Sequence, residues 1–415
     1  MRKKSVFINC MEALTANRKH NEARALLNAG LKESAQRQTA ATAPAYVPTK
    51  PYVFPAVDGN MTYHTSWGSH GVKEEAETIL SVLSSFRLRS TLAKINQGPR
   101  LTQYVIEPAP GTQVQSILRR EKEFQAALHC NASLRFDNGY VYIEVPTGTE
   151  TVFLGDMLID NAFQSSDGFT MAIGMAVDGS KHYIDIAKAC HILISGMTGS
   201  GKSIVLHNLI LSLLMKKNPA QMHLYIIDPK ATEFEYYKNL AACTVVSEVN
   251  GAVELLKNLC IEMDRRYSIL ASTGCRDIDS YNTKFADAPM RRDIVFIDEL
   301  SDLMSMGGKS VEGHIVRIAQ KARACGIHLV IATQYPVAKV VTGLIKANMP
   351  TKICLRVGTV TNSMVALDMA GGEKLMGHGD MLFLPNGSLS PVRLQGGFVS
   401  ETAINNIVAG LMKNQ

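Results

Sequence analysis

The sequence predicts an α/β protein in which a large domain with a mainly parallel sheet follows a small α+β domain and a basic N-terminal tail. Three observations indicate this class. Apolar, strand-like runs alternate with helical stretches through the second half of the chain, and a glycine-rich turn joins one such run to a helix. The 415 residues, 46% hydrophobic and 19% charged, supply enough core material for about two domains.

The predicted small domain covers residues 71–168. Apolar periodicity predicts helices over residues 72–86 and 114–130, and alternation predicts strands over residues 101–107 and 140–145. No catalytic cluster is recognisable in this segment. We therefore expect it to serve assembly or structure.

Six apolar runs predict the strands of the large domain, residues 169–415. They lie at residues 192–195, 224–228, 245–249, 294–298, 329–333 and 353–357. The intervening stretches have helical character, such as residues 204–217. Strands that alternate with helices in this way pair in parallel, because each helix carries the chain back to the start of the next strand.

The first 70 residues differ from both domains. Residues 1–38 predict a basic, partly helical tail, and residues 39–70, with four prolines, predict a flexible linker. Residues 1–40 contain eight basic and three acidic side chains, and so hold +5 of the formal net charge of +6. Such an arm can attract phosphate backbones of any base sequence. A solvated tail without that partner stays an open alternative.

Composition also excludes several classes of protein. No run approaches the roughly 18–20 apolar residues of a membrane span, and the N-terminus lacks the apolar core of a secretory signal. We therefore expect a cytoplasmic protein with no membrane partner. The eight cysteines are scattered singly, which argues against a disulfide framework and against a zinc site.

The glycine-rich turn has the spacing G-x-x-x-x-G-K-[ST] between a predicted strand and a predicted helix, the context of a P-loop. Its residues are Gly196, Met197, Thr198, Gly199, Ser200, Gly201, Lys202 and Ser203. Glycines let successive N–H groups point at phosphate oxygens, and the helix N-terminus favours an anion. We predict that the turn binds ATP, with Lys202 on the β- and γ-phosphates and the Ser203 hydroxyl on Mg²⁺. A glycine-rich turn arising by chance would not need the Lys-Ser pair.

Two later strand ends add polar groups. Asp298 and Glu299 follow a buried run, where Asp298 is predicted to hold the Mg²⁺ shell and Glu299 to orient the attacking water. Thr333 and Gln334 end the next strand, where their side chains can contact the γ-phosphate. Lys202, Glu299 and Gln334 are thus candidate catalytic residues. The alternative for the acidic pair is an ordinary turn at a strand end.

Several further stretches resemble the FtsK/SpoIIIE family of hexameric DNA translocases, in the family's order. They are IDPK at 227–230, EMDRRY at 262–267, VFIDELSDLM at 295–304, AQKARACGIH at 319–328, TGLIKANMPT at 342–351 and GHGDML at 377–382. The resemblance covers residues 71–415 and implies an α domain followed by a RecA-like P-loop ATPase domain. It also implies a homo-oligomeric ring, a hexamer, that hydrolyses ATP between subunits and pumps double-stranded DNA through its pore.

The resemblance assigns roles to further residues. Arg323 would be a catalytic arginine finger that reaches the neighbour's γ-phosphate, with Arg317 as the fallback. A surface arginine without that task is the alternative for either residue. Asp228 and Lys230 would lie near the nucleotide, or would serve only the fold or a subunit contact.

Departures from the family concern DNA contact. Tyr335 stands where the family usually has an arginine, and Val360 corresponds to a lysine that the family often has in the next pore loop. The candidate DNA contacts are Tyr335, Lys339, Lys346, Lys352 and Arg356. Fewer pore charges should weaken DNA contact and flatten its salt dependence.

The family's membrane spans and winged-helix domain have no counterpart in the sequence, so we expect a motor without these parts, suited to a phage, plasmid or other mobile element. Two other classes stay open. One is a ring ATPase that moves single-stranded DNA, RNA or a nucleoprotein in conjugation or packaging. The other is a scaffold that binds nucleotide without hydrolysing it. The biological task is left open by the residues.

Overall fold

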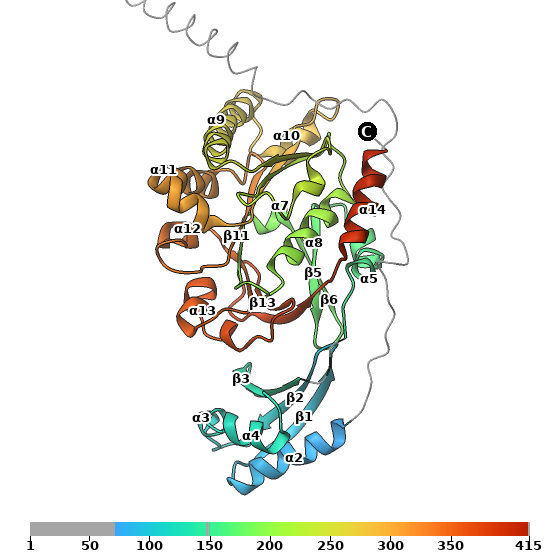
Figure 1. Cartoon of the computed structure of the whole chain (residues 1–415), viewed down its shortest axis with the longest axis vertical. Helices are drawn as coiled ribbons and strands as arrows, with labels where there is room; N and C mark the ends of the chain where they lie inside the picture. The colour runs from blue at the N-terminus through green and yellow to red at the C-terminus, as the bar shows by residue number, and fades with distance from the viewer. Residues whose placement is uncertain (1–70, 147, 149, 414–415) are drawn as a thin grey trace, which may run out of the picture. The chain divides into compact units, whose positions relative to one another are not determined.

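The computed structural model describes residues 71–413 apart from residues 147 and 149 (Figure 1). The predicted tail and linker, residues 1–70, lie outside the described residues. The predicted α/β class is confirmed: a small antiparallel sheet belongs to the first domain, and the second domain contains a mixed, mostly parallel sheet. No helix in the described ranges is long and apolar enough to cross a membrane.

The small domain combines three helices with a four-stranded sheet of order β1-β2-β4-β3. Its elements are α2 (Val72–Ser85), β1 (Ser90–Gln97), β2 (Leu101–Pro108), α3 (Val114–Leu118), α4 (Glu121–Leu128), β3 (Ser133–Asp137) and β4 (Tyr140–Pro146). Fully buried Tyr104, Phe124 and Ile143 join sheet and helices in one core. The sequence pattern does not predict β1 and β3, because both are edge strands with many part-exposed side chains. The helix predicted over residues 114–130 is two helices, α3 and α4.

The sheet of the large domain has the order β6-β5-β14-β13-β12-β7-β11-β10-β8-β9. Its strands are β5 (Thr170–Ala176), β6 (Lys181–Asp185), β7 (Ile192–Ser195), β8 (Met222–Ile227), β9 (Cys243–Val246), β10 (Arg292–Ile297), β11 (Ile327–Thr333), β12 (Thr351–Leu355), β13 (Asp380–Leu384) and β14 (Val392–Gly396). The neighbouring strands from β12 to β9 are parallel, whereas those from β12 to β6 are antiparallel.

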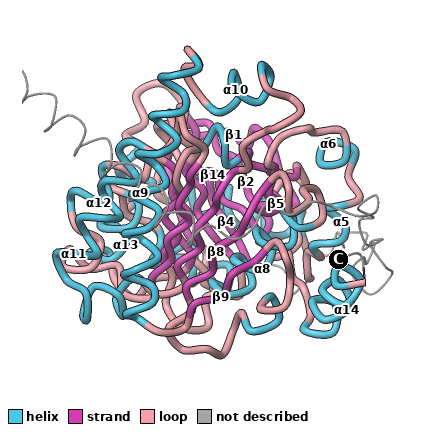
Figure 2. Tube along the Cα trace, turned by 90° about the horizontal axis from the view of Figure 1, so that it is seen from above, coloured by secondary structure: helices cyan, strands magenta, loops and turns pink. Residues whose placement is uncertain are grey.

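Helices cover both faces of this sheet (Figures 1 and 2). One face carries α5 (Leu154–Leu158), α8 (Lys202–Leu214) and α14 (Glu401–Met412), and the other carries α9 (Val249–Thr273), α11 (Leu300–Lys321) and α12 (Gly343–Ala347). The other helices of this domain that the structure describes are α6 (Asn161–Gln164), α7 (Ile186–Ala189), α10 (Ile278–Lys284) and α13 (Val360–Leu367), with 3-10 turns η1 (Glu235–Tyr237) and η2 (Gly372–Lys374). Each face of the sheet has its own core, because successive side chains of a strand point to opposite faces. In β7, Ile192 and Ile194 are buried in the core on the α8 side, and Leu193 is buried in the core on the α9 side.

The six strands predicted from apolar runs all occur, with ends shifted by one or two residues in most of them. They are the six parallel strands; apart from the edge strand β9, which is only partly buried, most of their side chains are buried on both faces and therefore form continuous apolar runs. The four antiparallel strands β5, β6, β13 and β14 were not expected. Gly174 and Gly396 weaken the strand pattern of β5 and β14, although β5 is wholly buried.

The end of the small domain lies earlier than the expected residue 168. Val152, Leu154 and Phe163 are buried in the core of the large domain, and the Leu154 N–H donates to the Phe398 carbonyl at 2.9 Å. The apolar pattern of this segment predicts burial, but it does not determine which of two neighbouring cores receives the side chains. The structure shows that the segment packs with the large domain.

A buried ion cluster connects β4 of the small domain to β13 and β14. The Arg393 guanidinium donates to both Asp380 oxygens, at 3.0 and 2.7 Å, and it also contacts Glu144. Burial opposes ionisation of Glu144, but Arg393 and Arg135 outweigh it and hold the pKa of this carboxyl below its usual value. Arg393, Asp380 and Glu144 are all buried. The Arg393 guanidinium therefore compensates carboxylate charges that water does not reach.

Candidate active site

The P-loop connects β7 to α8, and its glycines are required by close contacts. Gly201 has a positive φ of 97°, and a Cβ there would lie 2.6 Å from the Gly379 nitrogen. A Cβ on Gly196 would lie 2.6 Å from the Ser200 hydroxyl oxygen. The loop is thus held tightly against its surroundings, and any side chain at these two positions would displace it.

Lys202, the first residue of α8, reaches the end of β10. Its ammonium lies 2.6 Å from Asp298 Oδ1, and both side chains are nearly inaccessible, at 4% and 3% exposure. An arriving phosphate would offer Lys202 a second anionic partner. Asp298 and the part-exposed Ser203 supply a carboxylate and a hydroxyl, oxygen donors of the kind that Mg²⁺ prefers.

These two donors fit a metal that is completed by other ligands. Within the described ranges, no group of three or more His, Cys, Asp or Glu side chains is placed to hold a metal ion. Mg²⁺ in nucleotide sites is commonly bound by only one or two protein oxygens, with phosphates and water as the remaining ligands. The residues present are therefore compatible with a nucleotide-bound Mg²⁺ and not with an all-protein metal site.

Glu299 is fixed by three hydrogen bonds. Its Oε1 accepts from the Thr333 hydroxyl at 2.8 Å and from the Ser301 N–H at 3.1 Å, and its Oε2 accepts from the Gln334 N–H at 2.9 Å. Gln334 in turn accepts a hydrogen bond from the Thr198 hydroxyl of the P-loop at 2.8 Å. The strand order β7-β11-β10 explains this chain of contacts, because it places the tip of β11 between the P-loop and the carboxylates.

Asp228 has a structural role in the conformation described. Its buried carboxylate accepts from five consecutive backbone N–H groups, those of residues 230–234, at 3.1–3.2 Å. This turn brings in Glu233, a residue that the sequence interpretation missed. Burial and the carboxylates of Asp298 and Asp228 raise the pKa of Glu233, so it lies near the phosphate-binding end of the sheet. Only its position five residues after Asp228 could have indicated this.

Arg323 lies at the opposite ends of the strands from its own P-loop. It precedes β11 whereas Thr333 ends it, and a seven-residue strand spans roughly 20 Å. Its side chain is exposed, and its charge adds to burial in lowering the pKa of His191 to about 4. Arg323 is therefore too far away to reach the nucleotide of its own subunit. Arg317 instead pairs with Asp264 at 2.6 Å.

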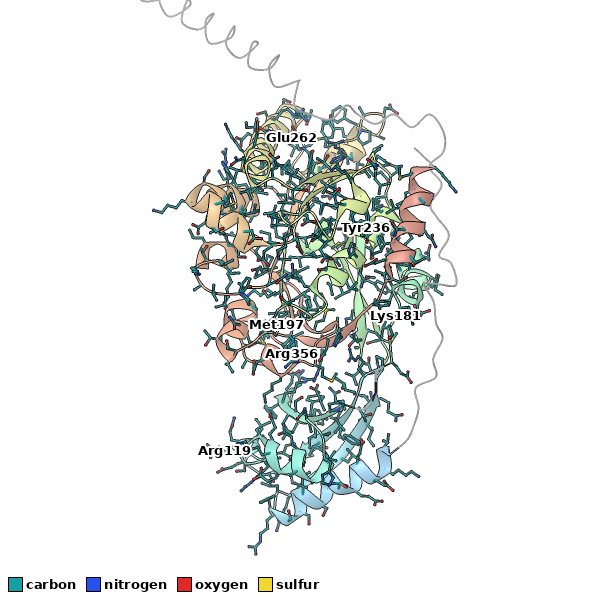
Figure 3. All side chains as sticks on the ribbon, in the orientation of Figure 1. Arg119, Lys181, Met197, Tyr236, Glu262 and Arg356 are labelled. Carbon is teal, nitrogen blue, oxygen red and sulfur yellow. The ribbon has the colours of Figure 1, made fainter. Side chains whose placement is uncertain are left out.

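Two of the five candidate DNA contacts are paired with an acid. Lys346 and Lys352 both pair with Asp368, which neutralises half of their charge. Arg356 lies beside the P-loop, where its carbonyl accepts from the Met197 N–H at 2.9 Å (Figure 3).

The loop after β11 contributes the other two candidates, Tyr335 and Lys339, both exposed. The amide of Asn362 donates to the Pro336 carbonyl at 3.1 Å, which ties this loop to α13. Exposed Val360 and Met364 lie on the same helix. This part of the surface therefore combines apolar side chains with few unpaired cations.

A cavity of about 350 Å³ adjoins the P-loop, and the sequence interpretation did not anticipate it. Its lining residues are Arg100, Glu150, Thr151, Gly201, Ile204, Val205, His378, Gly379, Gln395, Gly396, Gly397 and Phe398. The stretch 377–382, one of those that resemble the FtsK/SpoIIIE family, contacts the P-loop: the Gly379 N–H donates to the Ser200 carbonyl at 2.8 Å. Glycines at 377 and 379 were the available sign that this segment approaches another backbone closely.

The geometry defines the class of protein. A glycine-rich turn leads from β7 into α8, the acidic end of β10 lies opposite Lys202, and the polar tip of β11 lies between them. This is a RecA-like P-loop ATPase fold. The model of the FtsK/SpoIIIE family matches residues 154–338, and that of the FtsK alpha domain matches residues 59–147. The chain belongs to the FtsK/SpoIIIE family.

Curated relatives support this assignment. The chain is 39% identical over 377 residues to the DNA translocase SftA of Bacillus subtilis (strain 168), covering 86% of this chain and 39% of that protein. It is also 39% identical over 351 residues to the DNA translocase FtsK of Caldanaerobacter subterraneus subsp. tengcongensis, covering 82% and 49%. The chain thus spans 39% and 49% of the lengths of these two relatives.

Solved structures share the fold. The conjugation coupling protein TcpA of pCW3, in its monomer form with ATPγS, is 26% identical, with a TM-score of 0.60, covering 82% of this chain and 99% of that one. The cytoplasmic domain of the type VII secretion ATPase EccC of Thermomonospora curvata is 22% identical, with a TM-score of 0.55, covering 64% and 34%. The second similarity concerns the fold alone.

Proposed function

We propose that this chain is the motor of an ATP-dependent translocase that forms a hexameric ring and moves double-stranded DNA through its pore. The proposal rests above all on one observation. Glu299 is connected through Gln334 to Thr198 of the P-loop, beside the buried pair of Lys202 and Asp298. Groups that bind phosphate and a group that can activate water are thus coupled in one network, which nucleotide binding alone does not require.

In this proposal each residue has a separate task. Lys202 binds the β- and γ-phosphates, and Ser203 and Asp298 would hold a Mg²⁺ ion, which when bound neutralises phosphate charge. Glu299 orients the attacking water and accepts its proton, after its hydrogen bonds to β11 rearrange. Gln334 and Thr333, which donate to the Glu299 carboxylate, contact the γ-phosphate and so make the position of that carboxylate depend on the bound phosphate. Arg323 acts on the nucleotide of the neighbouring subunit, because roughly 20 Å of strand separates it from its own site.

DNA as the moved substrate is supported by the relatives, which are named DNA translocases. The test is ATP hydrolysis by the purified chain with and without duplex DNA, together with displacement of a third strand from a triplex substrate. We expect duplex DNA to stimulate hydrolysis and the third strand to be released only with ATP. ATP hydrolysis that does not respond to duplex DNA would contradict the proposed substrate.

A second candidate function is supported by the similarity to TcpA, a conjugation coupling protein. A motor of that kind would act on single-stranded DNA or a nucleoprotein. The exposed Tyr335 would suit it, because aromatic side chains stack on unpaired bases. Hydrolysis stimulated more by single-stranded than by duplex DNA of equal length would favour this candidate.

A further inference from the structure

We infer that the cavity beside Gly201 receives the nucleoside half of the bound nucleotide, with Arg100 and Glu150 as its hydrogen-bonding partners. The small domain would then complete the ATP site of the motor. This inference rests on the proposed ATPase function and adds to it two residues from outside the P-loop domain's sheet.

The position of the cavity fits a nucleoside. Its lining includes Gly201, Ile204 and Val205, which flank Lys202 and Ser203 at the start of α8. A triphosphate wrapped by the P-loop ends at this first turn, so the attached sugar and base must lie against the residues that follow. The volume of about 350 Å³ is within the range of small-molecule sites.

Three buried polar atoms in the lining lack a partner among the residues that the structure describes. They are Arg100 Nε, Glu150 Oε2 and Gln395 Oε1. Buried polar atoms without a partner are uncommon, and three around one cavity indicate that a polar ligand satisfies them. The set contains one donor and two acceptors, which matches a ligand with both ring nitrogens and hydroxyl groups.

Arg100 is held in place for this task. It lies in the turn between β1 and β2, just before β2 begins, and its Nη1 donates to the His378 carbonyl at 3.3 Å. The preceding Gly98 approaches Val177 of the large domain so closely that a Cβ would lie 3.0 Å from its Cα. The guanidinium is therefore anchored at the rim of the cavity, with Nε left to donate to a ligand.

The remaining lining complements a base and a ribose. Phe398 is 42% exposed and, with Ile204 and Val205, offers an apolar surface against which a flat ring can pack. A carboxylate such as Glu150 is the group that proteins commonly place on ribose hydroxyls. Gln395, whose amide nitrogen donates to the His378 carbonyl at 2.8 Å, leaves its oxygen for an amino group on the base.

The test compares ligands with and without a nucleoside. Calorimetric titrations with ATPγS and with inorganic tripolyphosphate would be made on the whole chain and on Arg100→Ala, Glu150→Gln and Arg119→Ala. Arg119, an exposed arginine of the small domain that does not line the cavity, is the matched control. Thermal melts would show that each variant is folded.

We expect Arg100→Ala and Glu150→Gln each to weaken ATPγS binding on the order of tenfold and to leave tripolyphosphate binding unchanged, since one hydrogen bond to a charged group is lost. Arg119→Ala should bind both ligands normally. Folded Arg100→Ala and Glu150→Gln proteins that bind ATPγS as tightly as the control would overturn the inference, and so would equal losses for both ligands. A wild-type chain that binds neither ligand would instead refute the proposed function.

Discussion

Replacing Glu299 by glutamine separates nucleotide binding from water activation. The substitution keeps the shape of the side chain and leaves Lys202 and Asp298 untouched, so ATP affinity should change by no more than a few-fold. Hydrolysis should fall 10²- to 10⁴-fold, the usual contribution of a general base, which corresponds to about 3–5 kcal/mol of activation free energy.

The structure also predicts the effect of this change on stability. The amide oxygen can still accept from Thr333 and Ser301, but the amide nitrogen would face the Gln334 N–H, which now donates to Glu299 Oε2 at 2.9 Å. One hydrogen bond to a charged acceptor is lost in a site that is 1% exposed. We expect this to lower the free energy of unfolding by about 1.5–3 kcal/mol.

Three measurements check this prediction: steady-state ATP hydrolysis, calorimetric ATPγS binding and chemical denaturation. Lys202→Ala is the opposite control, because it should lose binding and hydrolysis together. Glu254→Gln, at an exposed position on α9, is the matched control and should behave as wild type. Equal loss of binding in Glu299→Gln and Lys202→Ala would show that Glu299 only maintains the structure. Undiminished hydrolysis in Glu299→Gln would refute its role with water.

Three further predictions follow. Arg323→Ala should lower hydrolysis, and mixing it with Lys202→Ala subunits should restore part of the activity; mixtures that never exceed the sum of their components would refute an arginine finger in trans. Arg393→Met should lower the free energy of unfolding by about 3–5 kcal/mol, because it removes the buried cation that Asp380 and Glu144 share and leaves Glu144 with Arg135 as its cationic partner. The depressed pKa of Glu144 stabilises the wild type above about pH 4.3, and this contribution should be lost as pH falls through the folded-state value. Thermal melts that show the same acid sensitivity in Arg393→Met would contradict this. Asp368→Asn should release two lysines and steepen the salt dependence of DNA binding by up to about two units, whereas an unchanged slope would exclude them as phosphate contacts.

Tertiary structure decided several features that no local pattern could reveal. Lys346 and Lys352 were expected as DNA contacts, yet both meet Asp368, a residue that follows them by 22 and 16 positions. Two of the three groups that donate to Glu299 belong to Thr333, at the end of β11, and Gln334, the next residue, which lie 34 and 35 positions further along the chain. The sequence shows which side chains are charged. Only the folded chain determines whether the opposite charge beside each of them belongs to a bound phosphate or to another side chain.

The sequence by itself determined the family, the fold class and the six parallel strands, because these depend on short-range patterns: glycine and lysine spacing in one turn, and continuous apolar runs for strands buried on both faces. It did not determine the antiparallel half of the sheet, the core that receives residues 152–163, or the approach of Arg100 to the cavity beside the P-loop. The periodicity of apolar residues predicts that a side chain is buried, but it does not predict which other elements of the fold pack against that side chain. Contacts between residues about 100 to 300 positions apart exist only after the chain has folded.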